Sequence, residues 1–572
     1  MTGLSCAQQK IVELPLEAVC VTACAGSGKT RTAVHRLWEI RKKLEDRHGI
    51  VALLSFSNVA VDTFRKDYYA LLEIRGGPHA SGVEISTVDA FITANILRPH
   101  AHRTMGASRT AYLVHGREPF LGNYKVFDGT QNHSIAELTA RFDGSSFVYS
   151  AIYGHSSRPI DKAIAEKAIA KFGKTGAFTH SLGRYWAIQT LGNQTFVLRA
   201  LARRYPHIIV DEAQDIGSEH EIVLEALREA GVQLSLIGDV NQGIFEFAGA
   251  DGKYLSSFGG SAGVVSRELT ENYRSVPDIV TVANNLTGRS DTAIRKKPDQ
   301  LSGAFIVPYK KDAQEALLAT FRSLLDRANV MADCAAIVCR GTDTVDEWRG
   351  AAETQGQGTL RFFAEACIAR DGYCNLPEAF EQVCRGIVAL LVPDHSNLLS
   401  LMSLNRASSD VRRAKHLIWA FMRDPATGLP SGMLPAAKEW HAALLKNVKN
   451  LLQKLHSECG LKSIETVGNK MARTKLTDSP LIQAAAGQAG APMKYRVSTV
   501  HRVKGESIDA VMYVATKANV RDMLNGTRSE DGRIGYVALT RARDLFVLAV
   551  PECDLSGFEE KLYAKGFKKA PS

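Results

Sequence analysis

The sequence predicts an α/β protein with two parallel-sheet cores, each carrying a mainly helical insertion. First, short β-rich runs that end in polar or Gly-rich turns alternate with helical stretches, as in a parallel sheet covered by helices. Second, the stretches 96–195 and 345–490 differ in texture from their surroundings, and the second is mostly helical in pattern. Third, the runs form two series, at 18–23, 50–56, 83–87, 207–211 and 232–238, and at 304–309, 334–339, 495–499, 510–515 and 545–550.

These patterns divide the chain into four regions. We expect the first core to comprise 1–95 and 196–265, with 96–195 inserted, and the second core to comprise 266–344 and 491–572, with 345–490 inserted. Between Pro435 and Gly460 apolar residues recur at helical spacing and predict a long amphipathic helix, whose stripe is more typical of a core than of a partner surface. These residues are Leu444, Leu445, Val448, Leu451, Leu452 and Leu455.

Length and composition fit a soluble globular protein. The 572 residues suggest three or four domains at roughly 100 to 200 residues each, and one or two large cores with insertions fit equally well. Apolar residues make up 45% of the chain and charged residues 23%, so it can bury a core. We find no run of about 18 apolar residues that could span a bilayer and no signal peptide, and therefore expect a cytoplasmic protein without membrane contact.

The charge balance favours a polyanionic partner. Lys and Arg outnumber Asp and Glu 70 to 60, for a formal net charge of +10. An ordinary solvated surface is the alternative. The ten cysteines are scattered, without paired CxxC arms or clustered histidines, which indicates buried free thiols rather than a metal site.

A glycine-rich loop follows the first predicted strand. Residues 19–23 run into Cys24-Ala25-Gly26-Ser27-Gly28-Lys29-Thr30, and a helix-compatible sequence follows. Backbone N–H groups of such a loop wrap phosphates at a helix N-terminus, while Lys29 reaches the β and γ phosphates and Thr30 can ligate magnesium. The usual first glycine of the pattern is Ala23 here. The predicted phosphate contacts are Ala25, Gly26, Ser27, Gly28, Lys29 and Thr30.

Acidic residues follow another predicted strand. Ile208-Ile209-Val210 ends in Asp211-Glu212-Ala213-Gln214-Asp215, at the edge where a parallel sheet presents ligands to phosphates. Asp211 would hold magnesium, and Glu212 would orient or deprotonate the attacking water. Acids that merely cap the next helix are the alternative. Because no NKxD guanine signature is evident, ATP is preferred to GTP.

The same motif order continues through both cores. Further motifs are Ser55-Phe56-Ser57-Asn58, Thr87-Val88-Asp89-Ala90-Phe91, Gly238-Asp239-Val240-Asn241-Gln242, Glu271-Asn272-Tyr273-Arg274-Ser275, Thr499-Val500-His501-Arg502-Val503-Lys504-Gly505-Glu506 and Tyr536-Val537-Ala538-Leu539-Thr540-Arg541-Ala542. With Leu4-Ser5-Cys6-Ala7-Gln8 at the start, the chain resembles the UvrD/Rep-like superfamily 1 (SF1A) DNA helicases. The resemblance implies two RecA-like P-loop NTPase cores.

The resemblance also implies roles around ATP. Gln8 and Tyr273 would contact adenine, and Arg31 would follow the phosphate loop as it does in that family. Gln242 would sense the γ-phosphate. Arg274 would approach the same phosphate, and Arg541 would act as an arginine finger, which can be worth about 10³ to 10⁵ in rate.

Other motif residues would contact single-stranded DNA. Phe245 and Phe247 occupy positions where the family stacks aromatics on bases, an interaction worth roughly 1 to 3 kcal/mol per base. Two phenylalanines two apart are also common in cores. The remaining predicted contacts are Phe56, Asn58, Thr87, Thr499 and His501.

The chain departs from the family pattern in two motifs. Phe247-Ala248-Gly249-Ala250 stands where the family usually has Trp-Arg-Gly-Ala, which predicts weaker coupling between DNA contact and ATP turnover. The acid expected to hold the ribose hydroxyl is displaced by one residue, to Glu506. The helical insertion is also short, and we see no nuclease cluster after the last motif.

The resemblance implies an ATP- and Mg²⁺-dependent translocase or helicase on single-stranded DNA and ss/ds junctions, with 3′ to 5′ polarity. Short UvrD-like proteins of this kind resemble helicase subunits of anti-phage systems such as Gabija, as well as stand-alone repair or recombination motors, and the residues favour neither antiviral defence nor DNA repair. One alternative is a DNA-gated ATPase switch that signals to a partner such as a nuclease. Others are a P-loop NTPase that acts on protein, and RNA in place of DNA.

Overall fold

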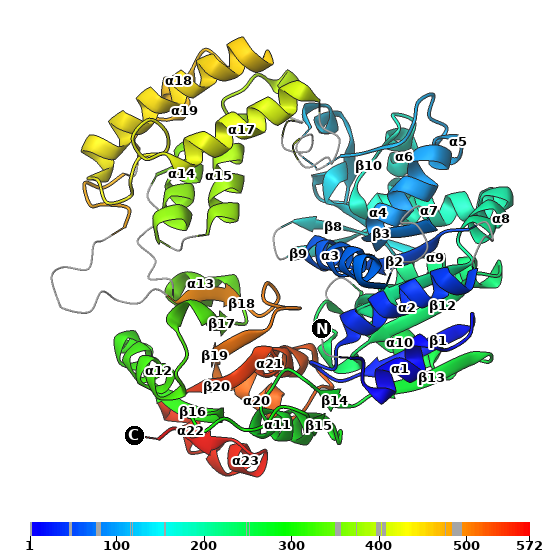
Figure 1. The fold of residues 1–572 in the computed structure, drawn as a ribbon. Helices are drawn as coiled ribbons and strands as arrows, with labels where there is room; N and C mark the ends of the chain where they lie inside the picture. Colours follow the sequence, from blue (N-terminus) through cyan, green and yellow to red (C-terminus); the bar gives the residue numbers. More distant parts are fainter. Residues whose placement is uncertain are drawn as a thin grey trace. The chain divides into compact units, whose positions relative to one another are not determined.

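The computed structural model divides the chain into two units (Figure 1). The first unit comprises Met1–Gly116, Phe120–Arg340 and Ser498–Ser572, and the second comprises Arg117–Pro119 and Gly341–Val497. The structure describes residues 3–44, 49–75, 82–114, 116, 118–153, 156–246, 249–250, 252–348, 356–372, 375–395, 398, 402, 408–474, 476–482 and 495–571.

A parallel sheet forms the first core of the first unit. Within the described residues its strand order is β13-β1-β12-β11-β2-β3, and each neighbouring pair is parallel. Five of its strands confirm the first predicted series, whereas β13 was not predicted. The strands are β1 (Ala18–Ala23), β2 (Val51–Ser55), β3 (Val83–Thr87), β11 (His207–Asp211), β12 (Gln233–Gly238) and β13 (Val264–Leu269).

Alternating side chains of these strands enter two separate hydrophobic clusters. Val19 and Val21 of β1 pack with residues of α2 (Lys29–Leu44) and α3 (Asn58–Arg75). Ala18 and Cys20 belong to the opposite cluster, with residues of α9 (Ser218–Glu229) and α10 (Lys253–Phe258). Since strand side chains alternate in direction, a strand covered on both faces is apolar throughout, as the sequence of β1 is.

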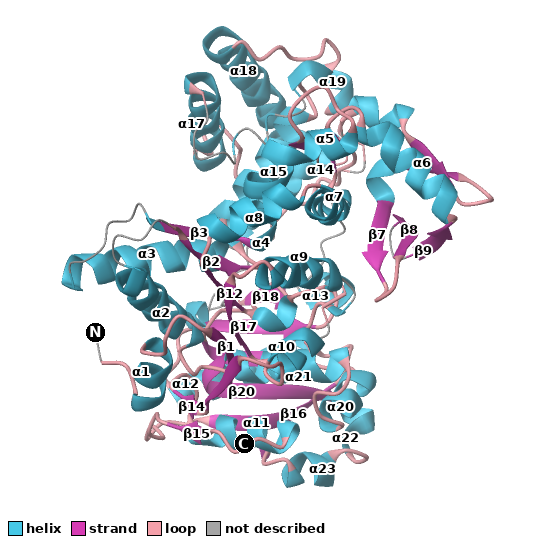
Figure 2. Cartoon of the chain, turned by 90° about the vertical axis from the view of Figure 1, so that its right-hand side faces the viewer, coloured by secondary structure: helices cyan, strands magenta, loops and turns pink. Residues whose placement is uncertain are grey.

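Helices and a small antiparallel sheet separate β3 from β11. The sheet order is β7-β8-β9, and α6 lies beside it (Figure 2), so strands accompany the helices expected here. The helices are α4 (Val88–Ile92), a π-helix (Thr93–Ala101), α5 (His102–Met105), α6 (Lys162–Gly173), α7 (His180–Asn193) and α8 (Thr195–Arg204). The strands are β4 (Tyr112–Leu113), β5 (Lys125–Phe127), β6 (Asn132–Ser134), β7 (Leu138–Phe142), β8 (Phe147–Tyr153), β9 (Ser156–Ile160) and β10 (Ala177–Phe178).

A second sheet has the order β18-β17-β19-β20-β16-β21 in the part of the chain that the structure describes. The pairs β17–β19, β19–β20, β20–β16 and β16–β21 are parallel, and the sheet confirms the second predicted series of strands. The strands are β16 (Gly303–Tyr309), β17 (Ala335–Cys339), β18 (Arg496–Thr499), β19 (Ile508–Val514), β20 (Ala542–Pro551) and β21 (Lys568–Lys569).

Helices cover this sheet as well. α11 (Pro277–Thr287), α20 (Lys517–Leu524) and α21 (Glu530–Arg541) share a hydrophobic cluster with its strands. α12 (Gln314–Ala328) contacts β16 and β20. The remaining elements of the first unit are α1 (Cys6–Val12), β14 (Glu271–Asn272), β15 (Thr292–Ala293), α22 (Glu552–Leu555) and α23 (Glu559–Ala564).

The second unit is helical and has its own core. The predicted amphipathic helix is α18, which ends at Gly460 in a left-handed conformation, and its apolar stripe is buried inside this unit as expected of a core. The helices are α13 (Thr342–Trp348), α14 (Thr359–Cys367), α15 (Leu376–Val388), α17 (Ser409–Arg423), α18 (His441–Cys459) and α19 (Val467–Lys470).

Among the described residues, no helix combines the length and apolar character needed to cross a bilayer. The cysteines of this part of the chain are free thiols, and no three metal-ligating side chains gather into a cluster.

Candidate active site

Two glycines shape the loop between β1 and α2. Gly26 and Gly28 have φ values of 70° and 78°, the left-handed region that favours glycine. A Cβ on Gly26 would lie 2.5 Å from Cβ of Arg274, and a Cβ on Gly28 would lie 2.7 Å from Nε2 of Gln8. Glycine is therefore required where two other motifs approach the loop. Lys29 begins α2 and is buried.

Gln8 is held against this loop from α1. Ser5 and Gln8 form a capping box, in which Oε1 of Gln8 accepts a hydrogen bond of 3.0 Å from the Ser5 N–H. Nε2 of Gln8 donates to the carbonyl oxygen of Ser27 at 2.9 Å. The predicted adenine contact therefore lies directly beside the phosphate loop.

Tyr273 and Arg31 lie near the same loop. The Tyr273 N–H donates to the carbonyl oxygen of Gly26 at 2.9 Å, and Tyr273 as a whole residue is 38% exposed, so a flat ligand can reach it. Burial, followed by the hydrogen bond to Glu271, raises the pKa of Tyr273, while the charge of Arg31 lowers it. The structure thus brings together Gln8, Arg31 and Tyr273, the residues predicted around adenine.

Asp211 is the last residue of the buried strand β11, and Glu212, which follows it, has a φ of 54°. Burial, and then the neighbouring carboxylate, raise the pKa of Asp211 to about 7. Burial acts in the same direction on Glu212, but the charges of Lys29 and Lys504 bring the pKa of Glu212 down to about 2. Glu212 is therefore ionised at neutral pH and can accept a hydrogen bond from water.

The oxygen atoms around Asp211 fit a hard divalent cation. Oγ1 of Thr30 lies 3.4 Å from Oδ2 of Asp211. Oδ1 of Asp211 is buried and has no hydrogen-bond partner among the described residues. An unpartnered carboxylate oxygen is costly to bury, and Mg²⁺ prefers oxygen ligands. Thr30 and Asp211 are therefore suited to hold Mg²⁺.

A chain of hydrogen bonds links the two sheets. Nε2 of Gln242 donates to Oδ2 of Asp239 at 2.7 Å, and Nη2 of Arg541 donates to Oε1 of Gln242 at 2.9 Å. Nη1 of Arg541 donates to the carbonyl oxygen of Glu506 at 3.3 Å. Arg541 therefore lies at the end of the first sheet, and Glu506 contributes its backbone to the placement of Arg541.

Arg274 lies near Arg541. Nη1 of Arg274 donates to the carbonyl oxygen of Thr540 at 2.9 Å. Burial, and then the charge of Arg541, lower the pKa of Arg274 to about 9, and burial also lowers the pKa of Arg541. Arg541 is buried and Arg274 is half-buried. Two such guanidinium groups that repel each other favour an anion between them, and a polyphosphate would meet that need.

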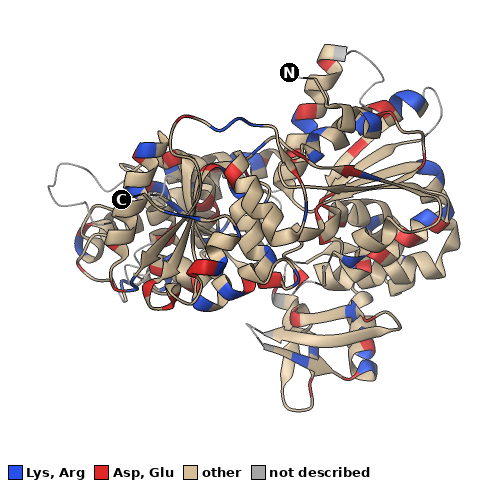
Figure 3. Ribbon diagram, turned by 90° about the horizontal axis from the view of Figure 1, so that it is seen from below, with Lys and Arg blue, Asp and Glu red and all other residues tan. Residues whose placement is uncertain are grey.

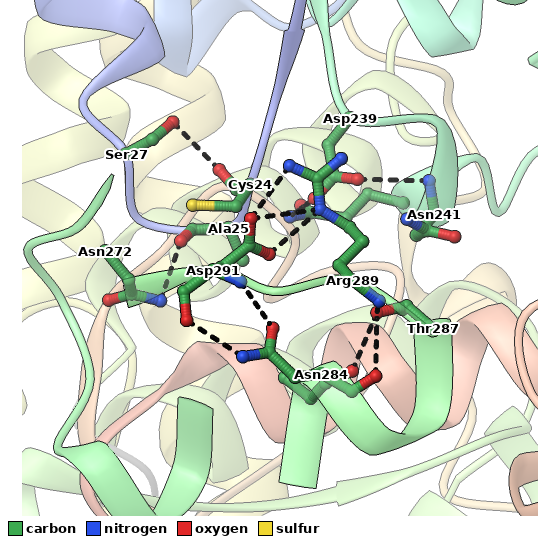
Figure 4. Close-up of polar contacts among 12 residues, drawn as sticks. Cys24, Ala25, Ser27, Asp239, Asn241, Asn272, Asn284, Thr287, Arg289 and Asp291 are labelled. Atoms are coloured by element: carbon green, nitrogen blue, oxygen red, sulfur yellow. Dashed lines mark hydrogen bonds and ion pairs between the residues drawn. The ribbon is translucent and has the colours of Figure 1, made fainter. Parts of the chain in front are cut away.

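A polar cluster that the motifs did not predict lies beside the loop (Figure 4). Arg289 forms a forked ion pair with Asp291, with Nη2 2.8 Å and Nε 2.9 Å from its carboxylate oxygens. Burial raises the pKa of Asp239, which the charges of Lys29 and Arg289 oppose. Nδ2 of Asn272 donates to the carbonyl oxygen of Ala25 at 2.8 Å. Arg289 and Asp291 lie in a loop after α11 with no motif spacing, so only the fold identifies them.

The strand-end motifs of the first core occupy the ends of β2 and β3. Phe56 packs edge-on against His220 of α9, with ring centroids 5.6 Å apart. Asn58 begins α3 and is exposed. Thr87 caps α4, and its Oγ1 accepts a hydrogen bond from the Ala90 N–H at 3.2 Å. Phe56 and Asn58 remain accessible to a ligand, whereas the Thr87 hydroxyl has a structural role.

The remaining residues predicted to contact single-stranded DNA come from both cores. The Phe245 ring lies 5.8 Å from the His501 ring, and Nε2 of His501 lies 3.0 Å from the carbonyl oxygen of Ile244. Thr499 is buried. Phe247 and Ala248 lie outside the described residues.

A buried ion pair between the cores was not predicted. Nζ of Lys504 lies 2.6 Å from both carboxylate oxygens of Asp215, and both side chains are buried. The same ammonium lies 4.7 Å from the centroid of the Phe245 ring. Lys504 therefore connects the acidic strand end with the aromatic segment that follows Gln242.

Comparison with known proteins agrees with this arrangement. Residues 4–175 and 177–262 match the model of the UvrD/REP helicase N-terminal domain. The chain is 23% identical to ATP-dependent DNA helicase UvrD2 of Mycobacterium tuberculosis (strain ATCC 25618 / H37Rv), over 95% of this chain and 78% of that protein. It is 22% identical to DNA helicase II of Haemophilus influenzae, over 100% and 86%, and 25% identical to ATP-dependent DNA helicase PcrA of Bacillus subtilis, over 53% and 41%.

Proposed function

As a UvrD-like protein of the superfamily 1 helicases, this chain is an ATP-hydrolysing enzyme, and we propose that it translocates on single-stranded DNA and unwinds duplex DNA at ss/ds junctions. The observation that carries the proposal is the hydrogen bond from Arg541 to Gln242, which joins the two sheets at the phosphate loop. A nucleotide bound there would contact both cores, so its hydrolysis can change how they are held together.

The proposed roles follow the geometry. Thr30 and Asp211 would hold Mg²⁺, and the ion would neutralise charge on the phosphates. Lys29 binds the phosphates, and Glu212 orients the attacking water. Arg274 and Arg541 neutralise the charge that develops as the phosphoryl group transfers.

Single-stranded DNA would bind where the strand-end motifs and Phe245 lie. Basic and acidic residues are interspersed along the ribbon (Figure 3). The net charge of +10 therefore does not by itself show where single-stranded DNA binds. The exposed Asn58 and the partly buried Phe56 and Phe245 carry the assignment instead. Base stacking on aromatic rings is sequence-tolerant, which suits a motor.

Polarity and pathway are proposed from the resemblance. We propose movement from 3′ to 5′, in DNA repair, recombination or anti-phage defence, and action in the cytoplasm, where ATP and DNA are available together. A nuclease is the proposed protein partner in a defence system. Duplexes with either a 3′ or a 5′ single-stranded tail test the polarity, because a 3′ to 5′ motor unwinds only the first kind.

The central test is steady-state ATPase of the wild type and Glu212→Gln, with and without single-stranded DNA at two salt concentrations. We expect DNA to stimulate the wild type, salt to weaken the stimulation as phosphate contacts are lost, and Glu212→Gln to abolish turnover. Robust turnover that is indifferent to DNA would reject the DNA motor and favour an NTPase that acts on protein.

Strand displacement separates a motor from a switch. A DNA-gated switch or effector subunit hydrolyses ATP in the presence of DNA yet leaves a tailed duplex intact. A motor releases the displaced strand at a rate that follows the ATPase.

A further inference from the structure

Helix α21 contacts both ends of the segment Gln242–Glu246. Arg541, the last residue of the helix, binds Oε1 of Gln242 at 2.9 Å. Arg533, about two turns earlier, donates from Nε to the carbonyl oxygen of Gly243 at 2.5 Å and from Nη2 to Oε2 of Glu246 at 2.6 Å. One rigid helix therefore holds both ends of this short segment.

The first turn of α21 and the turn before it add two more bonds to the same region. The Glu246 N–H donates to Oε1 of Glu530 at 3.1 Å. Oγ1 of Thr527 donates to Oδ1 of Asn241 at 2.6 Å. These bonds fix the backbone of the segment relative to α21, whereas the Glu246 carboxylate forms the ion pair with Arg533.

In the Arg533–Glu246 ion pair the guanidinium side is buried and the carboxylate side is half-exposed. The Arg533 side chain is 8% exposed and that of Glu246 is 50% exposed. Nη1 of Arg533 also donates to the carbonyl oxygens of Thr527 and Arg528, at 3.3 and 3.2 Å. A buried guanidinium needs a neutralising acid, and the acid that the structure provides belongs to the segment between Gln242 and the predicted stacking residues.

Phe245 lies inside the segment held in this way. It packs against His501, and Nζ of Lys504 lies 4.7 Å from its ring centroid. A ligand that shifts the backbone carrying this ring also shifts Glu246, the next residue. Arg533 would follow Glu246, and Arg541 lies on the same helix as Arg533.

We infer that the Arg533–Glu246 ion pair is a positioning contact that couples the position of Phe245 to the nucleotide site through α21. This coupling rests on the proposed function in one respect, because single-stranded DNA is the ligand that would move Phe245. Among the described residues, no hydrogen bond or ion pair joins Glu246 to the phosphate loop. Its removal should therefore uncouple the two sites without preventing nucleotide binding.

The test uses the full chain carrying Phe245→Trp as a fluorescent reporter, alone and combined with Glu246→Gln or Arg533→Lys. A non-hydrolysable ATP analogue is added without DNA, and the change in Trp emission is measured. The change seen in the protein that keeps Phe245, which comes from the other Trp residues, is subtracted. We expect the analogue to change the Trp emission, and Glu246→Gln to abolish that change while the analogue dissociation constant stays within about twofold. Glu315→Gln, at an exposed acid of α12, is the matched control and should leave the change intact.

A second readout is the DNA stimulation of ATPase, which should fall about fivefold or more in Glu246→Gln and in Arg533→Lys, since coupling between sites typically spans this range or a larger one. Adding Glu246→Gln to Arg533→Lys should cause no further loss, because the contact that Glu246→Gln removes is already lost in Arg533→Lys. A Trp response that persists in Glu246→Gln, or is missing in the reporter protein with Glu246 present, overturns the inference. Wild-type turnover that ignores DNA rejects the proposed function instead, and the Trp response still decides the inference.

Discussion

Nη2 of Arg541 donates a hydrogen bond of 2.9 Å to Oε1 of Gln242; Gln242 follows β12 of the first sheet, and Arg541 directly precedes β20 of the second. Arg541→Lys keeps the charge but lacks the guanidinium fork that also contacts the Glu506 carbonyl. We expect kcat to fall by about 10³-fold, at the lower end of the range for an arginine finger. Single-turnover hydrolysis measures this, and a fluorescent ATP analogue should still bind.

The control for that substitution is Arg543→Lys, two residues later, where the arginine side chain is 46% exposed. It should leave kcat within about twofold, because exposed ion pairs contribute little. Turnover of Arg541→Lys close to that of Arg543→Lys would contradict the assigned role.

Gly26 is required by both its backbone and its neighbour. Gly26→Ala would place a methyl group 2.5 Å from Cβ of Arg274 at a φ of 70°. We expect the dissociation constant of a fluorescent ATP analogue to rise at least about tenfold, which corresponds to a loss of about 1.4 kcal/mol in binding free energy. Gly106→Ala is the matched control, since Gly106 has a φ of 66° but nothing within 4 Å. It should lose about 1 kcal/mol of stability through the same left-handed strain and bind the analogue normally.

The buried pair of Lys504 and Asp215 should matter more than an exposed pair. Lys504→Met leaves the Asp215 carboxylate buried without its partner, and we expect a loss of about 3 to 5 kcal/mol in the free energy of unfolding. Lys517→Met breaks an ion pair in which the lysine side chain is 71% exposed, and it should cost less than about 1 kcal/mol. Urea unfolding followed by circular dichroism compares them. Equal losses would show that Lys504 is not effectively buried.

His207 should make the first core sensitive to mild acid. Burial lowers the pKa of His207 from 6.5 to about 3. The unfolded chain therefore takes up a proton near pH 6.5 that the folded chain does not, so stability is complete above pH 6.5 and falls as the pH drops toward 3. Between pH 7 and 5 this amounts to about 2 kcal/mol. Thermal unfolding at both pH values should show a smaller loss for His207→Gln than for the wild type, and an equal loss would refute the assignment.

The strands were predictable where both faces are buried. β1, β11 and β12 are short, mostly apolar runs, and their burial explains that pattern; β11 ends in an acid, β12 ends in a glycine, and β1 leads into the glycine-rich loop. β13 was missed because its middle residues Ser266, Arg267 and Glu268 are exposed at a sheet edge. Edge strands tolerate polar residues that sequence patterns assign to loops.

The candidate site was predictable where one motif carries its own chemistry. The spacing of Lys29 and Thr30 after the glycines, or of Asp211 and Glu212 after a strand, depends on local geometry alone. Arg289, Asp291 and Arg533 act through residues far away in sequence, so no local pattern marks them. The charge that faces Glu246 comes from the other core, 287 positions away.

The second sheet is interrupted by a helical unit, and this sets an order of events during synthesis. β16 ends at Tyr309, but its neighbours β20 and β21 begin at Ala542 and Lys568. At about 5 to 20 residues per second, the ribosome needs on the order of 10 to 50 s to supply the first of them. The apolar strands β16 and β17 wait unpaired during that time, while the helical unit, whose core lies within residues 360–482, can already fold. A nascent chain stalled before β19 would therefore carry a folded insertion on an open, aggregation-prone sheet edge, which makes this interval the point where a chaperone would act.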